Sequence, residues 1–339
     1  MTINTPHTSG SAPTDQFRFR HLHPKIFIGT ASDRYAGWMD QIYTRKHYEA
    51  QISKRSKKVG GHSFQEATLP VESVTEYFQH FSVLEIDYTF YSLLLDKDGQ
   101  PAKNFHVLKT YGQYIPEGER VVLKIPQVIS AQKVRHGKSF IANETYLDPD
   151  IFIKQFYEPA VSLLGNRLAG MIFEQEYQRK NERKPVQELA AELDQFFGSI
   201  PKDTRYHIEL RTGAYLNAPV FQVLEKHGAG QVLSHWTWLP RLKNQLAAAD
   251  GKNFNSGRNR IVRLMTPHGM RYEDAYARAF PFDKLVDGMV QPEMMQDTVD
   301  IMRKGIEENI ETHIIVNNRA GGNAPLIAEK IAGVFSGRV

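Results

Sequence analysis

The sequence predicts an α/β fold of the TIM type, a (β/α)8 barrel in which eight parallel strands alternate with helices. Short apolar runs rich in β-branched and aromatic residues recur eight times, and segments with helical periodicity lie between them. Eight such units within 339 residues favour a closed barrel over an open doubly wound sheet. The pattern alone still permits the open sheet.

The predicted strands are, in order, residues 25–30, 82–90, 120–125, 169–175, 206–211, 230–235, 260–265 and 312–318. Helical periodicity is found in residues 71–81, 149–165, 184–200, 217–228, 290–309 and 324–335. Several of these helices begin with Asp, Asn or Pro, which are residues that start helices. The order is therefore strand then helix along the chain, as a barrel of this class requires.

Two connections are longer than the barrel needs, residues 31–70 and 126–148. Both follow the carboxyl end of a predicted strand, where such barrels build their active sites, so we expect lids or substrate-binding loops there. Residues 1–24 are polar and rich in Ser, Thr, Pro and Gly, which predicts a flexible N-terminal arm ahead of a single barrel domain over residues 25–339.

Composition limits the location and chemistry of the protein. No apolar run approaches the length of a membrane helix, and the N-terminus lacks the hydrophobic stretch of a secretion signal, so we expect a soluble, cytoplasmic protein without a membrane partner. The chain has no cysteine, and any metal must therefore rest on His, Asp or Glu. Basic residues concentrate in residues 45–58, which read as a solvated loop or helix face or as a phosphate contact.

Strand parity identifies a set of charged side chains. Alternate residues of a strand point to opposite faces, so Glu85 and Asp87 oppose Leu84 and Ile86. The same alternation separates further charged residues from their apolar neighbours: Lys124, Glu174, Glu209, Arg211 and Arg263. We expect the apolar set to face the helices and the charged set to face the barrel interior or its mouth. These nearly balanced charges either neutralise one another as internal ion pairs or form a catalytic or binding centre.

Other candidates lie near the ends of the last three strands. Asn317, Asn318 and Gly322 lie in a Gly-rich turn before a helix, which is either an anion site or a plain capped turn. His235 and His268 lie at the expected active-site end, as satisfied polar residues or as catalytic groups.

No motif for an organic cofactor is present, so we predict a cofactor-independent protein. A divalent metal held by Glu85, Glu174, Glu209 and His235 is an alternative. Lys124, Arg211 and Arg263 would oppose a cation at that position.

Seven motifs together resemble the YecE-like family, domain of unknown function 72: GTASDRYAGW (29–38), FSVLEIDYTFY (81–91), VVLKIPQ (121–127), GMIFEQE (170–176), HIELRTGAYL (207–216), VRLMTPHG (262–269) and IIVNNRAGGNAP (314–325). The resemblance implies a TIM-type barrel and a family without an established activity. It covers, among others, Thr30, Tyr35, Trp38 and Tyr91. The sequence departs from the family pattern where Asp87 replaces Asn and Glu174 replaces Gln.

We therefore predict an enzyme that acts on a small polar, anionic or phosphorylated metabolite. Glu85 and Glu209 would be general acid and base, and Lys124 an electrophile or a partner that tunes their pKa. Arg211 and Arg263 would hold an anion, and Tyr35, Trp38 and Tyr91 would wall the pocket. Thr30, Asp87, Glu174, His235, His268, Asn317, Asn318 and Gly322 complete the predicted substrate-binding set.

Two alternatives come from other classes of protein. The basic residues 45–58 and 133–138 could hold nucleic-acid phosphates beside the barrel mouth. A protein that binds a metabolite in the same polar pocket without converting it is the other alternative.

Overall fold

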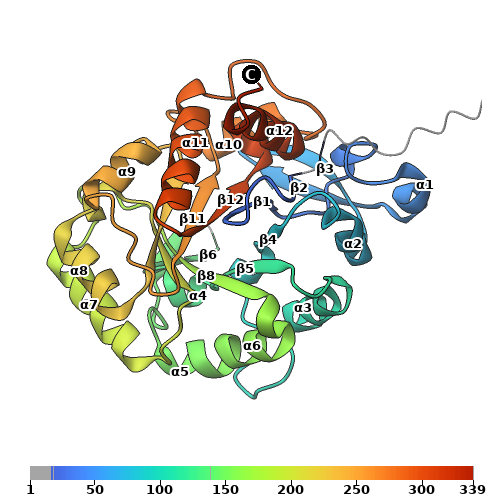
Figure 1. Cartoon of the computed structure of the whole chain (residues 1–339). Coiled ribbons are helices and arrows are strands. Elements are labelled where there is room, and N and C mark those ends of the chain that lie inside the picture. The colour runs from blue at the N-terminus through green and yellow to red at the C-terminus, as the bar shows by residue number, and fades with distance from the viewer. Residues whose placement is uncertain (1–16, 18, 138, 339) are drawn as a thin grey trace, which may run out of the picture.

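A computed structural model describes residues 17, 19–137 and 139–338, and eight parallel strands close into a barrel at its centre (Figure 1). The barrel strands follow one another in chain order: β1 (Ile26–Ala31), β4 (Val83–Ile86), β5 (Arg120–Lys124), β8 (Leu168–Gln175), β9 (Tyr206–Leu210), β10 (Gly230–His235), β11 (Asn259–Leu264) and β12 (Glu311–Val316). β12 pairs with β1 and closes the sheet. The eight predicted strands and the closed barrel are confirmed, and the open sheet is excluded.

The helices form the outer layer (Figure 1). The predicted helical segments contain α2 (Val74–Tyr77), α5 (Pro149–Phe152), α6 (Glu158–Leu164), α7 (Val186–Ser199), α8 (Ala218–His227), α11 (Pro292–Glu307) and α12 (Ala324–Phe335). The sequence pattern missed α3 (Lys103–Tyr114), α9 (Leu242–Ala248) and α10 (Tyr272–Ala279). Each of these buries only two or three side chains, which is too few to give a clear apolar period. α1 (Arg45–Tyr48) and α4 (Gln127–Ser130) are single turns.

The two faces of the strands build two separate cores. Leu84, Leu123, Phe173, Ile208 and Leu264 belong to the large cluster between strands and helices. Their neighbours in sequence point inward, and a second cluster fills the barrel: Phe27, Ala31, Val83, Val122, Ile172, Val232, Ile261, Met265 and Ile315. The alternation predicted from the sequence therefore holds, with the apolar set against the helices.

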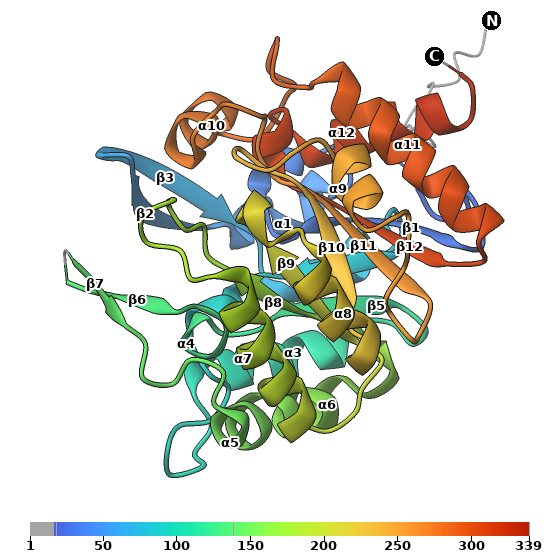
Figure 2. The ribbon, with the colours of Figure 1, turned by 90° about the vertical axis from the view of Figure 1, so that its left-hand side faces the viewer.

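Two antiparallel hairpins extend from the barrel on the side away from α11 (Figure 2). One pairs β2 (Ser53–Val59) with β3 (His62–Thr68), and the other pairs β6 (Lys133–His136) with β7 (Ser139–Ala142). They lie in the two long connections predicted after the first and third barrel strands. The basic run 45–58 was expected to be a loop or a helix face. Its first half is helical, in α1 and a 3-10 turn (Glu49–Gln51), but residues 53–58 belong to strand β2. Its nearly all-polar sequence gives no apolar alternation, so the strand could not be recognised.

The predicted flexible arm over residues 1–24 lies partly outside the described residues, namely 1–16 and 18. Its last part packs on the barrel instead: Phe17 and Phe19 are buried, and the Phe19 and Phe81 ring centres lie 4.9 Å apart. The Phe19 N–H donates to the His80 carbonyl at 2.9 Å. The predicted flexible arm therefore does not extend to residue 24, because Phe17 and Phe19 belong to the apolar core between the barrel strands and the helices. In the described part of the chain, no helix has the length and apolar character needed to cross a bilayer.

Candidate active site at the barrel mouth

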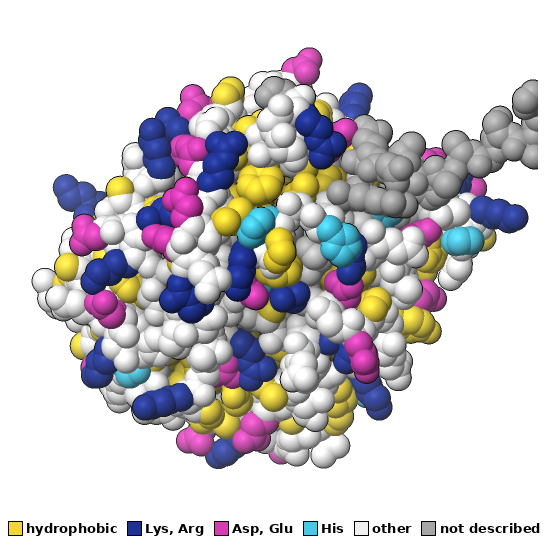
Figure 3. All heavy atoms as spheres, in the orientation of Figure 1, with side chains coloured by type: hydrophobic (Ala, Val, Ile, Leu, Met, Phe, Trp, Pro, Cys, Tyr) yellow, Lys and Arg dark blue, Asp and Glu magenta, His cyan; other side chains and the backbone are white. Residues whose placement is uncertain are grey.

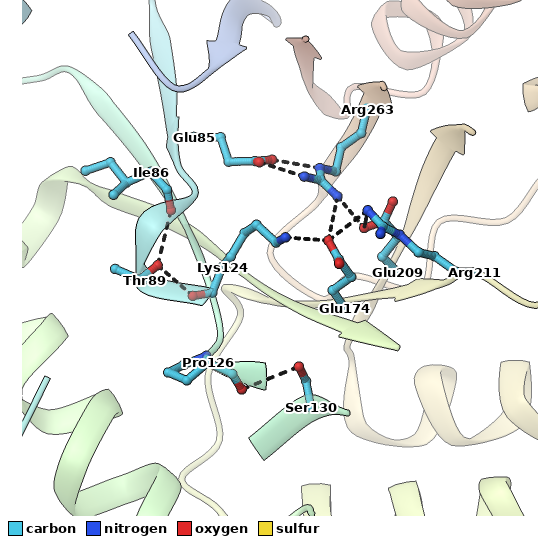
Figure 4. A network of polar contacts seen from close by, with 10 residues as sticks. All are labelled: Glu85, Ile86, Thr89, Lys124, Pro126, Ser130, Glu174, Glu209, Arg211 and Arg263. Carbon is cyan, nitrogen blue, oxygen red and sulfur yellow. Dashed lines mark hydrogen bonds and ion pairs between the residues drawn. The ribbon is translucent and has the colours of Figure 1, made fainter. Parts of the chain in front are cut away.

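Six charged side chains meet inside the barrel near the carboxyl ends of its strands (Figure 4). We call them the charge cluster: Glu85 on β4, Lys124 on β5, Glu174 on β8, Glu209 on β9, Arg211 directly after β9, and Arg263 on β11. The parity that puts apolar side chains on the helix side turns these residues inward. Three carboxylates and three cations therefore share one site, as the sequence predicted for all of them.

Arg263 lies at the centre of the charge cluster. Its Nε and Nη2 donate to the two oxygens of Glu85, each at 2.7 Å. Its Nη1 donates to Glu209 Oε2 and, at 3.3 Å, to Glu174 Oε2. The Arg263 side chain is 1% exposed, and Glu85 and Glu209 are fully buried. Arg263 thus joins three carboxylates from three strands, and it lies beneath the residues that reach the mouth.

Glu174 links this centre to the two more accessible cations. Its Oε2 lies 2.6 Å from Lys124 Nζ and 2.8 Å from Arg211 Nη2. Burial raises the pKa of the Glu174 carboxyl, but Arg211, Lys124 and Arg263 outweigh that effect and hold the pKa well below its usual value. Glu174 is therefore an anion at any ordinary pH.

Lys124 and Arg211 are the members of the charge cluster with the largest exposed fractions, 9% and 17% of their side chains. Burial lowers the pKa of the Lys124 amine, and Glu174 only partly opposes this shift. Lys124 Nζ also lies 3.8 Å from the centre of the Phe90 ring. The side of the cluster nearest the solvent is thus cationic, although the six charges sum to zero.

Two buried polar atoms of the charge cluster have no hydrogen-bond partner among the described residues. They are Glu209 Oε1 and Arg211 Nε, and both are buried. Buried polar atoms usually have partners. These two atoms therefore mark where a ligand would add hydrogen bonds.

Asp87 does not join the charge cluster, contrary to the prediction that it projects beside Glu85. β4 ends at Ile86, and the helical backbone of Asp87 (φ −91°, ψ −19°) starts a 3-10 turn, so strand alternation no longer applies. Its carboxylate accepts a hydrogen bond from Ser32 Oγ at 3.1 Å. Asp87 lines a separate cavity.

That cavity has a volume of about 720 Å³ and lies among the loop after β1, the β2–β3 hairpin and α3. Tyr35 and Tyr91, which were predicted to wall the substrate pocket, line this cavity, and Arg34 and Lys103 add positive charge. Tyr91 contacts Phe90, whose ring lies against Lys124. The cavity and the charge cluster are therefore neighbours, separated by Phe90.

Trp38, also predicted to wall the pocket, is fully buried and is not a lining residue. Its Nε1 donates to Asn318 Oδ1 at 3.0 Å, and the same oxygen accepts from the Ala324 N–H at 2.8 Å. Asn323 Oδ1 accepts from the Leu326 N–H at 2.9 Å, and Asn317 Oδ1 from the Arg319 N–H at 3.0 Å. The turn before α12 is therefore capped by its own asparagines, which corresponds to the plain capped turn rather than an open anion site.

Thr30 and Gly322, also predicted to bind substrate, instead contact neighbouring parts of the protein. The Thr30 hydroxyl donates to the Ser32 carbonyl at 2.6 Å, and its N–H donates to the Tyr77 hydroxyl at 2.9 Å. Gly322 has φ +108°, and an added Cβ would lie 2.3 Å from the Lys284 carbonyl oxygen. Both residues are thus held away from the charge cluster by contacts that shape the backbone.

Gly322→Ala is expected to lower the free energy of unfolding by more than the roughly 1–3 kcal/mol that a strained backbone conformation costs, because the methyl group also meets a carbonyl. Urea denaturation measures this change. Gly118→Ala is the matched control, since Gly118 has φ +82° but open space around its Cβ position. Equal losses in the two variants would mean that the contact with Lys284 does not matter.

The two predicted histidines lie together but outside the charge cluster. The His235 and His268 ring centres are 4.1 Å apart, and the backbone N–H of His268 donates to Gln291 Oε1 at 3.0 Å. Burial lowers the pKa of His235 to about 3, and it also lowers the pKa of His268. Both rings are therefore neutral near pH 7.

The alternative metal site does not assemble. Within the described residues, no three His, Asp or Glu side chains are arranged to hold a metal ion. Glu85, Glu174 and Glu209 instead direct their oxygens at Arg263, Lys124 and Arg211.

Some basic residues of the two segments proposed to hold nucleic acid already form ion pairs with carboxylates of the protein. Arg55 Nη2 and Lys57 Nζ pair with Glu66 at 2.7 and 3.0 Å. In the segment 133–138, Lys133 pairs with Glu182 at 3.2 Å, and Lys138 lies outside the described residues. On the face shown in Figure 3, Lys and Arg side chains alternate with Asp and Glu side chains. Nucleic-acid binding therefore stays a prediction.

The sequence interpretation missed three aromatic residues at this end of the barrel: Tyr177, Trp236 and Trp238. They follow β8 and β10 within a few residues. Tyr177 and Trp238 are among the exposed large hydrophobic side chains of the described residues. The signal available was their position, because aromatic residues in polar loops directly after barrel strands face the mouth.

Comparisons with known proteins agree with this fold. The model of a family described as "Protein of unknown function DUF72" matches residues 27–338. A DUF72 family protein from Enterococcus faecalis is 17% identical over 92% of this chain and 95% of its own, with a TM-score of 0.57. A DUF72 family protein from Thermotoga maritima is 14% identical over 92% and 98%, with a TM-score of 0.51. A search of curated proteins gave no match.

Proposed function

The chain belongs to the protein family of unknown function DUF72, and we propose that it is an enzyme that converts a small anionic metabolite at the charge cluster, without an organic cofactor. The observation that carries the proposal is the arrangement of charge. The cluster is neutral as a whole, but its two most exposed members, Lys124 and Arg211, are cations. An anionic group entering the barrel mouth would meet these two side chains first.

The roles of the six residues follow from their burial. Lys124 and Arg211 bind the anionic group of the substrate, such as a phosphate or a carboxylate. Because its pKa is lowered by burial, Lys124 can also donate a proton to a developing negative charge. Glu209 keeps one carboxylate oxygen without a partner among the described residues, so it is our candidate for the general acid or base.

Glu85 and Arg263 take a different role from the one suggested by sequence. Both oxygens of Glu85 accept from Arg263, and both side chains are buried. We assign them to positioning, because Arg263 fixes the orientation of Glu209 and Glu174. The histidine pair and the turn before α12 have no part in this proposal.

Lys124→Met is expected to weaken the binding of phosphorylated metabolites about tenfold or more, because it removes a charge-assisted hydrogen bond of about 1.5–3 kcal/mol. A thermal-shift screen with sugar phosphates, nucleotides and inorganic phosphate identifies a ligand, and calorimetric titration of both proteins with that ligand measures the change.

Lys154→Met is the control, because Lys154 is exposed and pairs with Asp150 on the surface. It should bind the ligand like the unchanged protein. Equal affinity in Lys124→Met would remove Lys124 from the binding site. A ligand that binds but yields no product after long incubation would favour the metabolite-binding alternative over the enzyme.

A further inference from the structure

The three aromatic side chains after β8 and β10 form one exposed surface, which we call the aromatic platform. The Tyr177 ring centre lies 5.9 Å from that of Trp236 and 6.2 Å from that of Trp238. Tyr177 is 44% exposed and Trp238 is 50% exposed. Trp236 is partly buried and packs on the apolar core inside the barrel. Large aromatic groups that cluster at a solvent-facing site indicate a binding surface.

The aromatic platform is directly joined to the charge cluster. The guanidinium carbon of Arg211 lies 5.1 Å from the centre of the Trp236 ring, within the range of a cation–π contact. The same guanidinium donates to Glu174 at 2.8 Å. A ligand that covers the platform would therefore have Arg211 beside it, and through Arg211 it would reach the site proposed above.

Three polar side chains that flank the aromatic platform in sequence, Glu176, Gln178 and Thr237, are already engaged within the protein. The Glu176 carboxylate accepts the N–H groups of Gln132 and Lys133 at 3.0 and 3.1 Å. Gln178 Oε1 accepts from the Tyr215 hydroxyl at 2.8 Å, and the Thr237 hydroxyl donates to the Met270 carbonyl at 2.7 Å. A sugar ring needs partners for its hydroxyl groups. A heteroaromatic ring gains its main binding energy from stacking, so this surface favours a heteroaromatic ring over a sugar ring.

We propose that the aromatic platform stacks the base of a nucleotide whose phosphate is bound by Lys124 and Arg211. This inference rests on the proposed function, because it takes the same two cations as the anion site and adds the substrate class. The stacking partners are Trp238 and Tyr177, whose rings are exposed. Arg211 lies between the two halves of the ligand, with Trp236 on one side and Glu174 on the other.

The test compares three probes by calorimetric titration of the full chain: adenosine 5′-monophosphate, adenosine without a phosphate, and ribose 5-phosphate without a base. The nucleotide is expected to bind at least about tenfold more tightly than either part. Trp238→Ala should weaken binding of the nucleotide and adenosine by about 5- to 150-fold, which corresponds to about 1–3 kcal/mol for a stacked base. Trp238→Ala should leave the affinity for ribose 5-phosphate unchanged. Lys124→Met should weaken the binding of the nucleotide and of ribose 5-phosphate, but not the binding of adenosine.

Tyr177→Ala and Tyr114→Ala are a matched pair, because the two tyrosines are equally exposed, at 44%. Tyr114 lies at the end of α3 that leads into β5, away from the mouth. Only Tyr177→Ala should weaken nucleotide binding. If ribose 5-phosphate binds as tightly as the nucleotide and Trp238→Ala changes neither, the platform is overturned and the anion site stands. If adenosine alone accounts for all binding and Lys124→Met has no effect, the nucleotide assignment and the proposed function both fail.

Discussion

Replacing Arg263 with methionine is expected to lower the free energy of unfolding by at least about 3–5 kcal/mol, the usual cost of leaving a buried charge without its partner. Arg263 donates to Glu85, Glu174 and Glu209, and two of these carboxylates are fully buried. This loss is a large fraction of the stability of a typical domain. Urea denaturation followed by circular dichroism at pH 7 measures it.

The sign of the pH dependence gives a second readout. Arg263 lowers the pKa values of the Glu85 and Glu174 carboxyls, so without it both bind protons more readily and become neutral as the pH falls. The loss caused by Arg263→Met should therefore be smaller at pH 4.5 than at pH 7.

Arg45→Met is the control for Arg263→Met, because Arg45 pairs with Asp40 and Glu49 on the surface and such pairs contribute little. A double variant, Arg263→Met with Glu85→Leu, should lose less than the sum of the two single changes, since it removes a charge together with its partner. An Arg263→Met protein as stable as Arg45→Met would contradict the central role of Arg263.

Asp33→Asn is expected to stabilise the protein above pH 6 by up to about 3 kcal/mol. Burial raises the pKa of Asp33 to about 6, although Arg34 and the hydrogen bond from Tyr111 oppose the rise. The Tyr111 hydroxyl donates to Asp33 Oδ1 at 2.6 Å, whereas the buried Oδ2 has no partner among the described residues. Asparagine keeps the acceptor for Tyr111 and removes the ionisation.

The pH window of this effect follows from the two pKa values. The unfolded carboxyl ionises near its ordinary pKa of about 3.9, and the folded one near 6. The folded chain therefore holds an extra proton between these values, and stability from this group is full below about pH 4 and falls as the pH rises to 6. Asp33→Asn lacks this fall.

Urea denaturation of both proteins from pH 4 to pH 8 tests this prediction. Asp150→Asn is the control, because Asp150 is exposed and pairs with Lys154 on the surface. Its difference from the unchanged protein should stay nearly constant over the same range. If the difference between Asp33→Asn and the unchanged protein is also constant, Asp33 does not titrate in the folded state between pH 4 and pH 6.

Strand parity made much of the candidate site predictable. Glu85, Lys124, Glu174, Glu209 and Arg263 were assigned to the inner face because their neighbours are apolar, and the structure brings them into one network. The rule applies only while the backbone is extended. It therefore failed at Asp87, where the chain has already turned into a 3-10 helix.

Other errors arose where a residue type has two common environments. Trp38 and Asn318 were assigned to the substrate site, yet they bond to each other 280 positions apart in sequence and hold the turn before α12. The opposite error was made for the aromatic platform, whose residues Tyr177, Trp236 and Trp238 were overlooked. In a sequence, an isolated aromatic residue of a loop looks the same whether it packs in the core or is exposed to bind a ligand. Contact partners decide between these cases, and a single sequence does not contain them.

The amino-acid sequence by itself determined the order of the eight barrel strands and the inward direction of the charged residues, because these depend on local periodicity and short connections. It favoured the closed barrel, but only the structure excluded the open sheet. Only the tertiary structure decided which charges are buried, which reach the mouth, and which aromatic rings lie beside Arg211. Those properties depend on the distances between side chains from different strands. The barrel fixes such distances only when it closes, and local periodicity does not encode them.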